Sequence, residues 1–76
     1  MPTFSYTVDG EPEQTDEHEL TPDQILTSAG LDTSTHYLVE IKGAVKESFE
    51  GKGGIELHMH DHMVFVSVFT GPTPVS

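Results

Sequence analysis

Three histidines at alternate positions, His58, His60 and His62, have the clearest capacity for chemistry in this chain. Imidazoles bind zinc, copper or nickel when several of them converge on one ion. On an extended strand, alternate side chains lie about 6.6 Å apart, so three of them span roughly 13 Å, too wide for one metal ion. A turn is expected at His60–His62, which keeps a metal site open as an alternative, but surface histidines at a strand turn are the favoured interpretation.

The chain offers little else for catalysis. It has no cysteine that could act as a nucleophile, and no serine lies in a recognisable nucleophile motif. Acidic pairs such as Asp16-Glu17 are ordinary on an acidic surface, and a chain of 76 residues leaves little room for an enclosed pocket. We therefore expect a protein that is not an enzyme and uses no cofactor.

The C-terminal segment is the second candidate for function. Met63–Thr70 is rich in β-branched and aromatic residues, which predicts a strand. Glycine and proline then prevent a regular continuation. We predict one domain over residues 1–70 and an extended tail over 71–76, which is either the working part of the protein or a frayed end. The tail consists of Gly71, Pro72, Thr73, Pro74, Val75 and Ser76.

The charge balance narrows the classes of partner. Lys and Arg number 3 against 13 Asp and Glu, a formal net charge of -10, so nucleic-acid binding is disfavoured and a basic protein partner is favoured. No stretch approaches membrane-spanning length, and no leader-like apolar run opens the chain. The absence of cysteine suits a reducing compartment. We expect a cytoplasmic protein with no membrane or nucleic-acid partner.

The elements that must position these groups begin with a β-hairpin. Apolar and polar residues alternate from Thr3 to Val8, the period of a half-buried strand. Asp9-Gly10 is a strong signal for a two-residue hairpin turn. The acidic segment Glu11–Leu20 then fits a second strand only at an exposed sheet edge, where charge discourages pairing with other chains.

One short helix follows. Thr21 can cap it, Pro22 suits its first position, and Gln24 completes a capping box. Gly30 is placed to end it as a C-terminal cap. The helix is therefore about two to three turns long.

The second half predicts three more strands. In His36–Lys42 we expect Tyr37, Val39 and Ile41 to face the core and Glu40 to face outward, with Leu38 alone apolar on that side. Gly43–Gly54 is interpreted as a long loop with one short helical turn at Val45–Phe49. Ile55 and Leu57 mark a brief strand before the last one. The predicted core consists of Phe4, Tyr6, Val8, Ile25, Leu26, Ala29, Val39, Ile41, Leu57 and part of Val64–Phe69.

This order of elements fits an α+β fold, a ubiquitin-like β-grasp in which a mixed sheet of four to five strands wraps one short helix. A ferredoxin-like fold would need a second full helix, which Gly43–Gly54 cannot supply. The chain resembles the bacterial multiubiquitin family of β-grasp domains. The residues that carry the resemblance are Tyr6-Thr7-Val8-Asp9-Gly10, Leu20-Thr21-Pro22, Ala29-Gly30-Leu31, Tyr37-Leu38-Val39 with Gly43, and Phe65-Val66-Ser67-Val68.

The resemblance implies a bacterial protein modifier, of a kind associated with defence against phage. Its partners would be an adenylating enzyme that activates the C-terminal carboxylate, a conjugating enzyme that joins it to an amine on a target, and a deconjugating peptidase. The tail 71–76 would be the conjugated element, although it ends in Val75-Ser76 and lacks a terminal Gly-Gly. Lys42, Lys46 and Lys52 are possible acceptors for a second modifier.

Two other functions remain as alternatives. The chain could be a non-covalent adaptor or inhibitor that binds a partner through its acidic surface or tail, or a metal-binding protein using His58, His60 and His62. Because Glu40 is expected on the outward sheet face, we also expect that proteins which recognise an apolar patch on the sheet of ubiquitin do not bind this chain.

Overall fold

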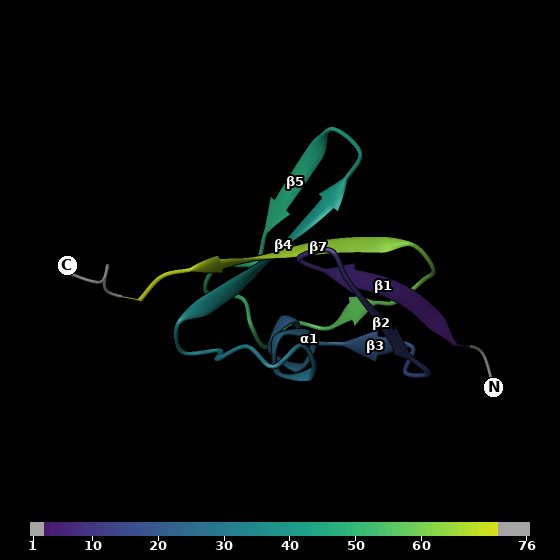
Figure 1. Ribbon diagram of the computed structural model, residues 1–76, viewed down its shortest axis with the longest axis horizontal. Coiled ribbons are helices and arrows are strands. Elements are labelled where there is room, and N and C mark those ends of the chain that lie inside the picture. Colours follow the sequence, from purple (N-terminus) through teal and green to yellow (C-terminus); the bar gives the residue numbers. More distant parts are fainter. Residues whose placement is uncertain (1–2, 72–76) are drawn as a thin grey trace.

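A computed structural model describes residues 3–71, which form one mixed sheet packed on one helix (Figure 1). The sheet has five strands in the order β2-β1-β7-β4-β5, with β1 and β7 parallel and the other neighbours antiparallel. This is the ubiquitin-like β-grasp topology, and it confirms the predicted fold class. The elements are β1 Phe4–Val8, β2 Glu11–Thr15, β3 Glu19–Leu20, α1 Pro22–Ser28, β4 His36–Lys42, β5 Val45–Ser48, β6 Leu57–His58 and β7 Met63–Phe69.

The predicted first hairpin is present. Asp9 and Gly10 have positive φ angles of 53° and 82°, as a two-residue turn of this hand requires, and β2 lies at the sheet edge. Asp9 also joins the hairpin to β7. Its N–H donates to the Phe65 carbonyl at 2.9 Å, and its carboxylate accepts the Ser67 N–H at 2.8 Å and the Ser67 hydroxyl at 2.5 Å.

The helix begins and ends where its signals predict. The Thr21 hydroxyl accepts the Gln24 N–H at 3.1 Å, while the Gln24 side chain accepts the Thr21 N–H at 2.9 Å. At the other end Gly30 has a φ of 79°, and the Leu31 N–H donates to the Leu26 carbonyl at 2.9 Å. The helix thus has local hydrogen bonds at both ends.

Replacing the cap should weaken the whole domain. We expect Thr21→Ala to lower the free energy of unfolding by about 1 kcal/mol, because the Gln24 N–H loses its acceptor and half of the capping box is removed. Urea denaturation followed by circular dichroism measures the change. Thr27→Ala, at an exposed position in the same helix, is the control and should change stability by less than about 0.5 kcal/mol.

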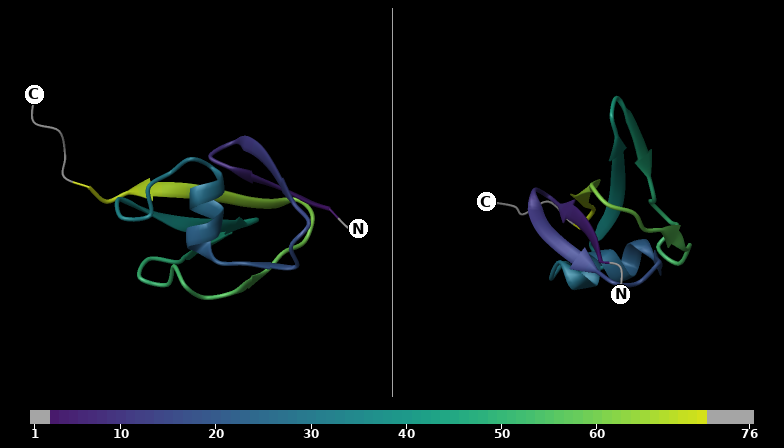
Figure 2. Two further views of the ribbon diagram at one scale, coloured as in Figure 1. Left: turned by 90° about the horizontal axis from the view of Figure 1, so that it is seen from below. Right: turned by 90° about the vertical axis from the view of Figure 1, so that its right-hand side faces the viewer.

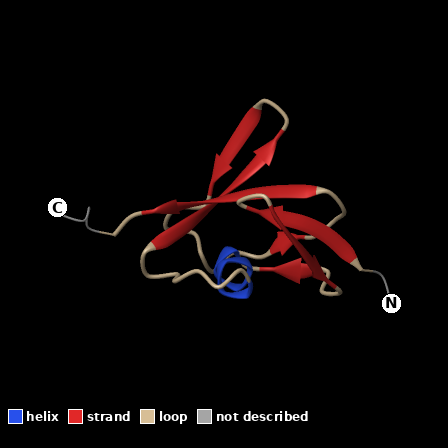
Figure 3. Ribbon diagram, in the orientation of Figure 1, coloured by secondary structure: helices blue, strands red, loops and turns tan. Residues whose placement is uncertain are grey.

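The core lies between α1 and the inner face of the sheet, the face turned toward the helix (Figures 2 and 3). Phe65 and Ile25 are fully buried, and the Tyr6 and Phe65 rings meet edge to face with centroids 5.9 Å apart. Predicted core residues Phe4, Ala29 and Leu57 are only partly buried. The core cluster consists of Tyr6, Val8, Leu20, Ile25, Leu26, Leu38, Phe49, Met59, Met63 and Phe65.

The predicted orientation of β4 is wrong. Leu38 is fully buried in the core, and Glu40, only 5% exposed, lies on the same inner face opposite Phe65. Val39 therefore points to the outer face with Tyr37 and Ile41. Alternation alone predicts the opposite orientation, because the outward residues are all apolar, whereas Leu38 is the one aliphatic residue on the inward side. The register with β7 decides it, because directly opposed residues in an antiparallel pair share a face.

The predicted loop and helical turn after Gly43 are also wrong. Val45–Ser48 is strand β5, which forms a hairpin with β4 through Gly43-Ala44, and Gly43 has a φ of 63°. The strand is short and carries two charges, so its local β preference is weak, and pairing with β4 overrides it. The predicted strand near Ile55 and Leu57 is present as β6, but it pairs with β3 in a separate two-stranded sheet.

Candidate functional site

The body ends at a defined point before the tail. Strand β7 occupies the middle of the sheet, and the Thr70 N–H after it donates to the Thr35 carbonyl at 2.6 Å. The half-exposed Phe69 ring lies against His36, with ring centroids 5.3 Å apart. We call Phe69, Thr70 and Gly71 the tail exit. Of the predicted tail, Gly71 belongs to this exit, and Pro72, Thr73, Pro74, Val75 and Ser76 lie outside the described residues.

Gly71 is tightly placed beside Phe69. A Cβ atom added to Gly71 would lie 2.5 Å from the Phe69 Cζ atom, so any side chain there requires the ring to move. Because the Phe69 side chain is exposed, that movement is possible without opening the core. Glycine at this position therefore lets the chain turn closely past the end of β7.

The part of the outer sheet face that β4 and β7 form, turned away from α1, is apolar. It pairs three residues of β4 with three of β7 directly across the strands: Tyr37 with Val68, Val39 with Val66, and Ile41 with Val64. Val64 is 42% exposed and Val39 is 9% exposed, so the patch is accessible mainly at its Val64 end. The expectation that this face presents Glu40 is overturned, and with it the reason to exclude partners that recognise an apolar sheet face.

Acidic residues avoid this outer face. The strand carboxylates Glu11 and Glu13 lie opposite the inward residues Val8 and Tyr6, and Glu47 lies opposite the inward Glu40. Across the described strands, no Asp or Glu takes an outer position, and the charged residue that does is Lys46, opposite Ile41. In a chain with a net charge of -10, the outward strand positions of this sheet therefore carry no carboxylate.

The three candidate acceptor lysines occupy different surroundings. Lys42 Nζ donates to Glu47 at 2.9 Å, and this bond raises the pKa of Lys42, which keeps the amine protonated and poorly nucleophilic. Lys46 is exposed on β5 at the border of the outer face, and Lys52 is exposed in the loop after Phe49. Lys46 and Lys52 are therefore better placed than Lys42 to accept a modifier.

The three histidines of the proposed metal site diverge. His58 Nδ1 lies 3.6 Å from a Glu19 oxygen across the β3–β6 pair, and the His60 backbone N–H donates to Met63 Sδ at 3.3 Å. His62 lies in the turn before β7, with a φ of 68°. Within residues 3–71, no three His, Asp or Glu side chains come together as metal ligands. The turn expected at His60–His62 is present, but among the described residues it does not bring the three histidines together as ligands.

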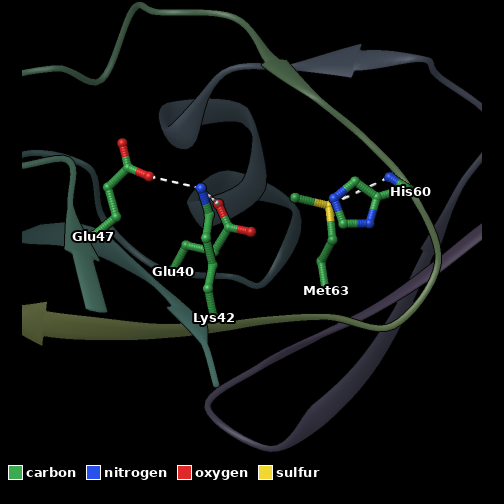
Figure 4. Close-up of polar contacts among 5 residues, drawn as sticks. All are labelled: Glu40, Lys42, Glu47, His60 and Met63. Carbon is green, nitrogen blue, oxygen red and sulfur yellow. Dashed lines mark hydrogen bonds and ion pairs between the residues drawn. The ribbon is translucent and has the colours of Figure 1, made fainter. Parts of the chain in front are cut away.

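Sequence reasoning missed a charged cluster on the inner side of the β4–β5 hairpin. Lys42 Nζ is 3.9 Å from Glu40 Oε1 and 2.9 Å from Glu47 Oε1, so its hydrogen bond goes to Glu47 (Figure 4). Glu40 and Glu47 are directly opposed across the hairpin, a like-charge pairing that Lys42 offsets. Burial raises the pKa of Glu40 above its ordinary value of 4.5, while Lys42 opposes that rise and Glu47 adds to it.

This cluster predicts a pH dependence of stability. The folded state binds the Glu40 proton more tightly than the unfolded state does. The contribution of protonated Glu40 to stability is therefore present at low pH and is lost as pH rises from about 4.5 through the raised pKa. We expect Glu40→Gln to be more stable, relative to the original chain, near pH 7 than near pH 4. Denaturation of both proteins across this range measures the difference.

Glu47→Gln provides the contrast. The hydrogen bond from Lys42 lowers the pKa of Glu47, so its contribution is present above the ordinary glutamate pKa and is lost as pH falls through the lowered one. Relative to the original chain, Glu47→Gln should therefore lose more stability at neutral pH than at low pH. If both variants changed the pH slope in the same direction, the assigned environments would be wrong.

No protein-family model, curated protein or solved structure matches the chain. Among the helices in the described part, none is long and apolar enough to cross a membrane.

Proposed function

We propose that this chain is a bacterial ubiquitin-like modifier of the multiubiquitin type, conjugated through its C-terminal carboxylate. An adenylating enzyme would join the carboxylate to AMP from ATP and release pyrophosphate. An enzyme thiol would then displace AMP, and a target amine would displace the thiol with help from the conjugating enzyme. A deconjugating peptidase would hydrolyse the amide bond between modifier and target. The pathway would act in the cytoplasm in defence against phage.

The observation that carries this proposal is the position of β7. The last strand lies between β1 and β4, and the chain leaves the sheet at the tail exit, where Thr70 is bonded to Thr35. The domain is thus anchored up to the residue before Gly71. A carboxylate beyond this point could enter a partner's active site while the folded domain remained outside it, and the two prolines in the tail limit the entropy lost on binding.

Mass spectrometry tests the modifier function directly. The chain would be co-expressed with an activating and a conjugating enzyme of this type, in three forms: intact, without Ser76, and with one added residue. We expect adducts through the Ser76 carboxylate of the intact form and their loss in the form without Ser76. Adducts on the extended form only after removal of the added residue would identify a processing step. An intact chain that forms no adduct and supports no ATP–pyrophosphate exchange contradicts the proposal.

The same samples test the acceptor lysines. We propose that any chains form mainly on Lys46 or Lys52, since Lys42 is held by Glu47. Peptide mapping of the adducts would locate the linkage, and substitution of each lysine by arginine would confirm it. A linkage predominantly at Lys42 would contradict this ranking.

A non-covalent adaptor is the second candidate, and the acid-free outer face favours it. Val64→Asp places a charge on the exposed end of that face and should abolish co-purification of an adaptor with its partner. The form without Ser76 should retain that binding. If the adaptor function were correct, the intact chain would co-purify unmodified, and if binding survived Val64→Asp, the outer face would not be the surface used.

A further inference from the structure

A cleft opens between the β4–β5 hairpin and the segment that contains β6. Its volume is about 320 Å³, and we call it the Glu40 cleft. Its lining includes an apolar part, which we call the apolar wall and which consists of Phe49, Ile55 and Leu57. Its charged lining consists of the carboxylates Glu40, Glu47 and Glu56 and the cation Lys42, and His58, His60 and Met63 complete it.

Glu40 is a buried carboxylate without a hydrogen-bond donor among the described residues. It is 5% exposed, and its nearest cation, Lys42 Nζ, is 3.9 Å away and bonded to Glu47. In Figure 4 one Glu40 oxygen lies beside Lys42, and the other turns away from it toward the side of Met63 and His60. The described residues contain no fully buried side-chain oxygen without a partner, so the Glu40 oxygens keep contact with solvent through the cleft. The partial loss of water around this carboxylate raises its pKa.

The missing donors match an arginine side chain. A guanidinium offers parallel N–H groups in a planar fork, which bind a carboxylate through two hydrogen bonds. The methylene stem of arginine covers apolar surface while its head group remains paired, and the apolar wall of Phe49, Ile55 and Leu57 suits that stem. The net charge of -10 adds attraction for a basic partner over longer range.

We propose that the Glu40 cleft binds an arginine side chain presented by a basic partner protein. The guanidinium would pair with the Glu40 carboxylate and lie near Glu47 and Glu56, with its stem against the apolar wall. This contact is non-covalent and does not involve the tail exit or the outer face. It therefore holds whether or not the C-terminus is conjugated.

The test uses the isotope-labelled full chain and two small probes. N-acetyl-arginine N-methylamide carries the guanidinium, and N-acetyl-citrulline N-methylamide has nearly the same shape without the charge. In an NMR titration we expect the arginine probe to cause saturable shifts at Glu40, Phe49 and Leu57, with an affinity at least about fivefold above that of the citrulline probe. Equal affinities for the two probes, or shifts that never saturate, would overturn the proposal.

Variants locate the contact. Glu40→Gln should weaken arginine binding at least about fivefold, whereas Glu11→Gln, which makes the same charge change at an exposed position on β2, should alter it less than about twofold. Preserved dispersion of the NMR spectrum establishes that both variants are folded. Equal weakening by the two variants would mean that net charge, and not the cleft, attracts the probe. A lysine probe that binds as tightly as arginine would refute recognition of the guanidinium fork.

Discussion

Phe65→Ala should cause the largest loss of stability of any substitution considered for this domain. Phe65 is fully buried at the centre of the core, between the two strands that flank β7, and its ring meets Tyr6 edge to face. Replacing a buried phenylalanine by alanine costs about 3–5 kcal/mol, because apolar contact is lost and a cavity remains. A chain of 76 residues has a total stability of about 4–11 kcal/mol, so this loss is a large fraction of the free energy of unfolding.

Val64→Ala is the matched control on the same strand. Val64 is 42% exposed on the outer face, and its truncation should cost less than about 1 kcal/mol. Urea denaturation of the two variants, followed by near-UV and far-UV circular dichroism, measures both values. Similar losses from the two substitutions would contradict the assignment of Phe65 to the inner face and Val64 to the outer face.

Asp9→Ala should cause the second largest loss, about 2–3 kcal/mol. The substitution removes the acceptors of the Ser67 N–H and hydroxyl, and hydrogen bonds to a charged group contribute about 1.5–3 kcal/mol. It also forces alanine into the left-handed conformation that Asp9 adopts, a cost of about 1–2 kcal/mol. Because Asp9 is exposed, water partly compensates for the lost bonds, so the two contributions do not add in full.

Two further variants separate these contributions. Ser67→Ala removes the hydroxyl bond alone and should cost about 1 kcal/mol or less. Asp9→Asn tolerates the positive φ and keeps one carbonyl acceptor, so its loss should be intermediate. Chemical denaturation gives the order of the three free energies of unfolding. A free energy of unfolding for Asp9→Ala within about 0.5 kcal/mol of that of the original chain would contradict the proposed link between the hairpin and β7.

The inward orientation of β4 has consequences for function. It moves Glu40 into the cleft under the β4–β5 hairpin and leaves Tyr37, Val39 and Ile41 on the outer face with the valines of β7. The chain therefore presents an acidic cleft and an acid-free apolar surface on opposite sides of the sheet. Substitutions on one of these surfaces leave the residues of the other unchanged, which allows separate tests of the two surfaces.

Local signals in the sequence were sufficient for several elements. The Asp9-Gly10 turn, the capped helix Pro22–Ser28 and the strand His36–Lys42 appear where neighbouring residues predict them. In each case the deciding interaction lies within a few residues, as in the bonds between Thr21 and Gln24. The fold class followed from the order of such elements, because few arrangements of one helix and these strands bury both apolar faces.

Only the tertiary structure decided which side of β4 meets the helix. The existence of β5 and of the Glu40 cleft also became apparent only from the tertiary structure. The inward position of Leu38 depends on its register with β7, more than twenty residues away, where Leu38 lies opposite Ser67 and Glu40 opposite Phe65. Alternation along β4 favours the opposite orientation, because the residues that share a face with Leu38 are polar, so no local signal predicts the observed one. Strand β5 and the burial of Glu40 likewise follow from pairing across strands, whose free energy comes from contacts between residues distant in the chain.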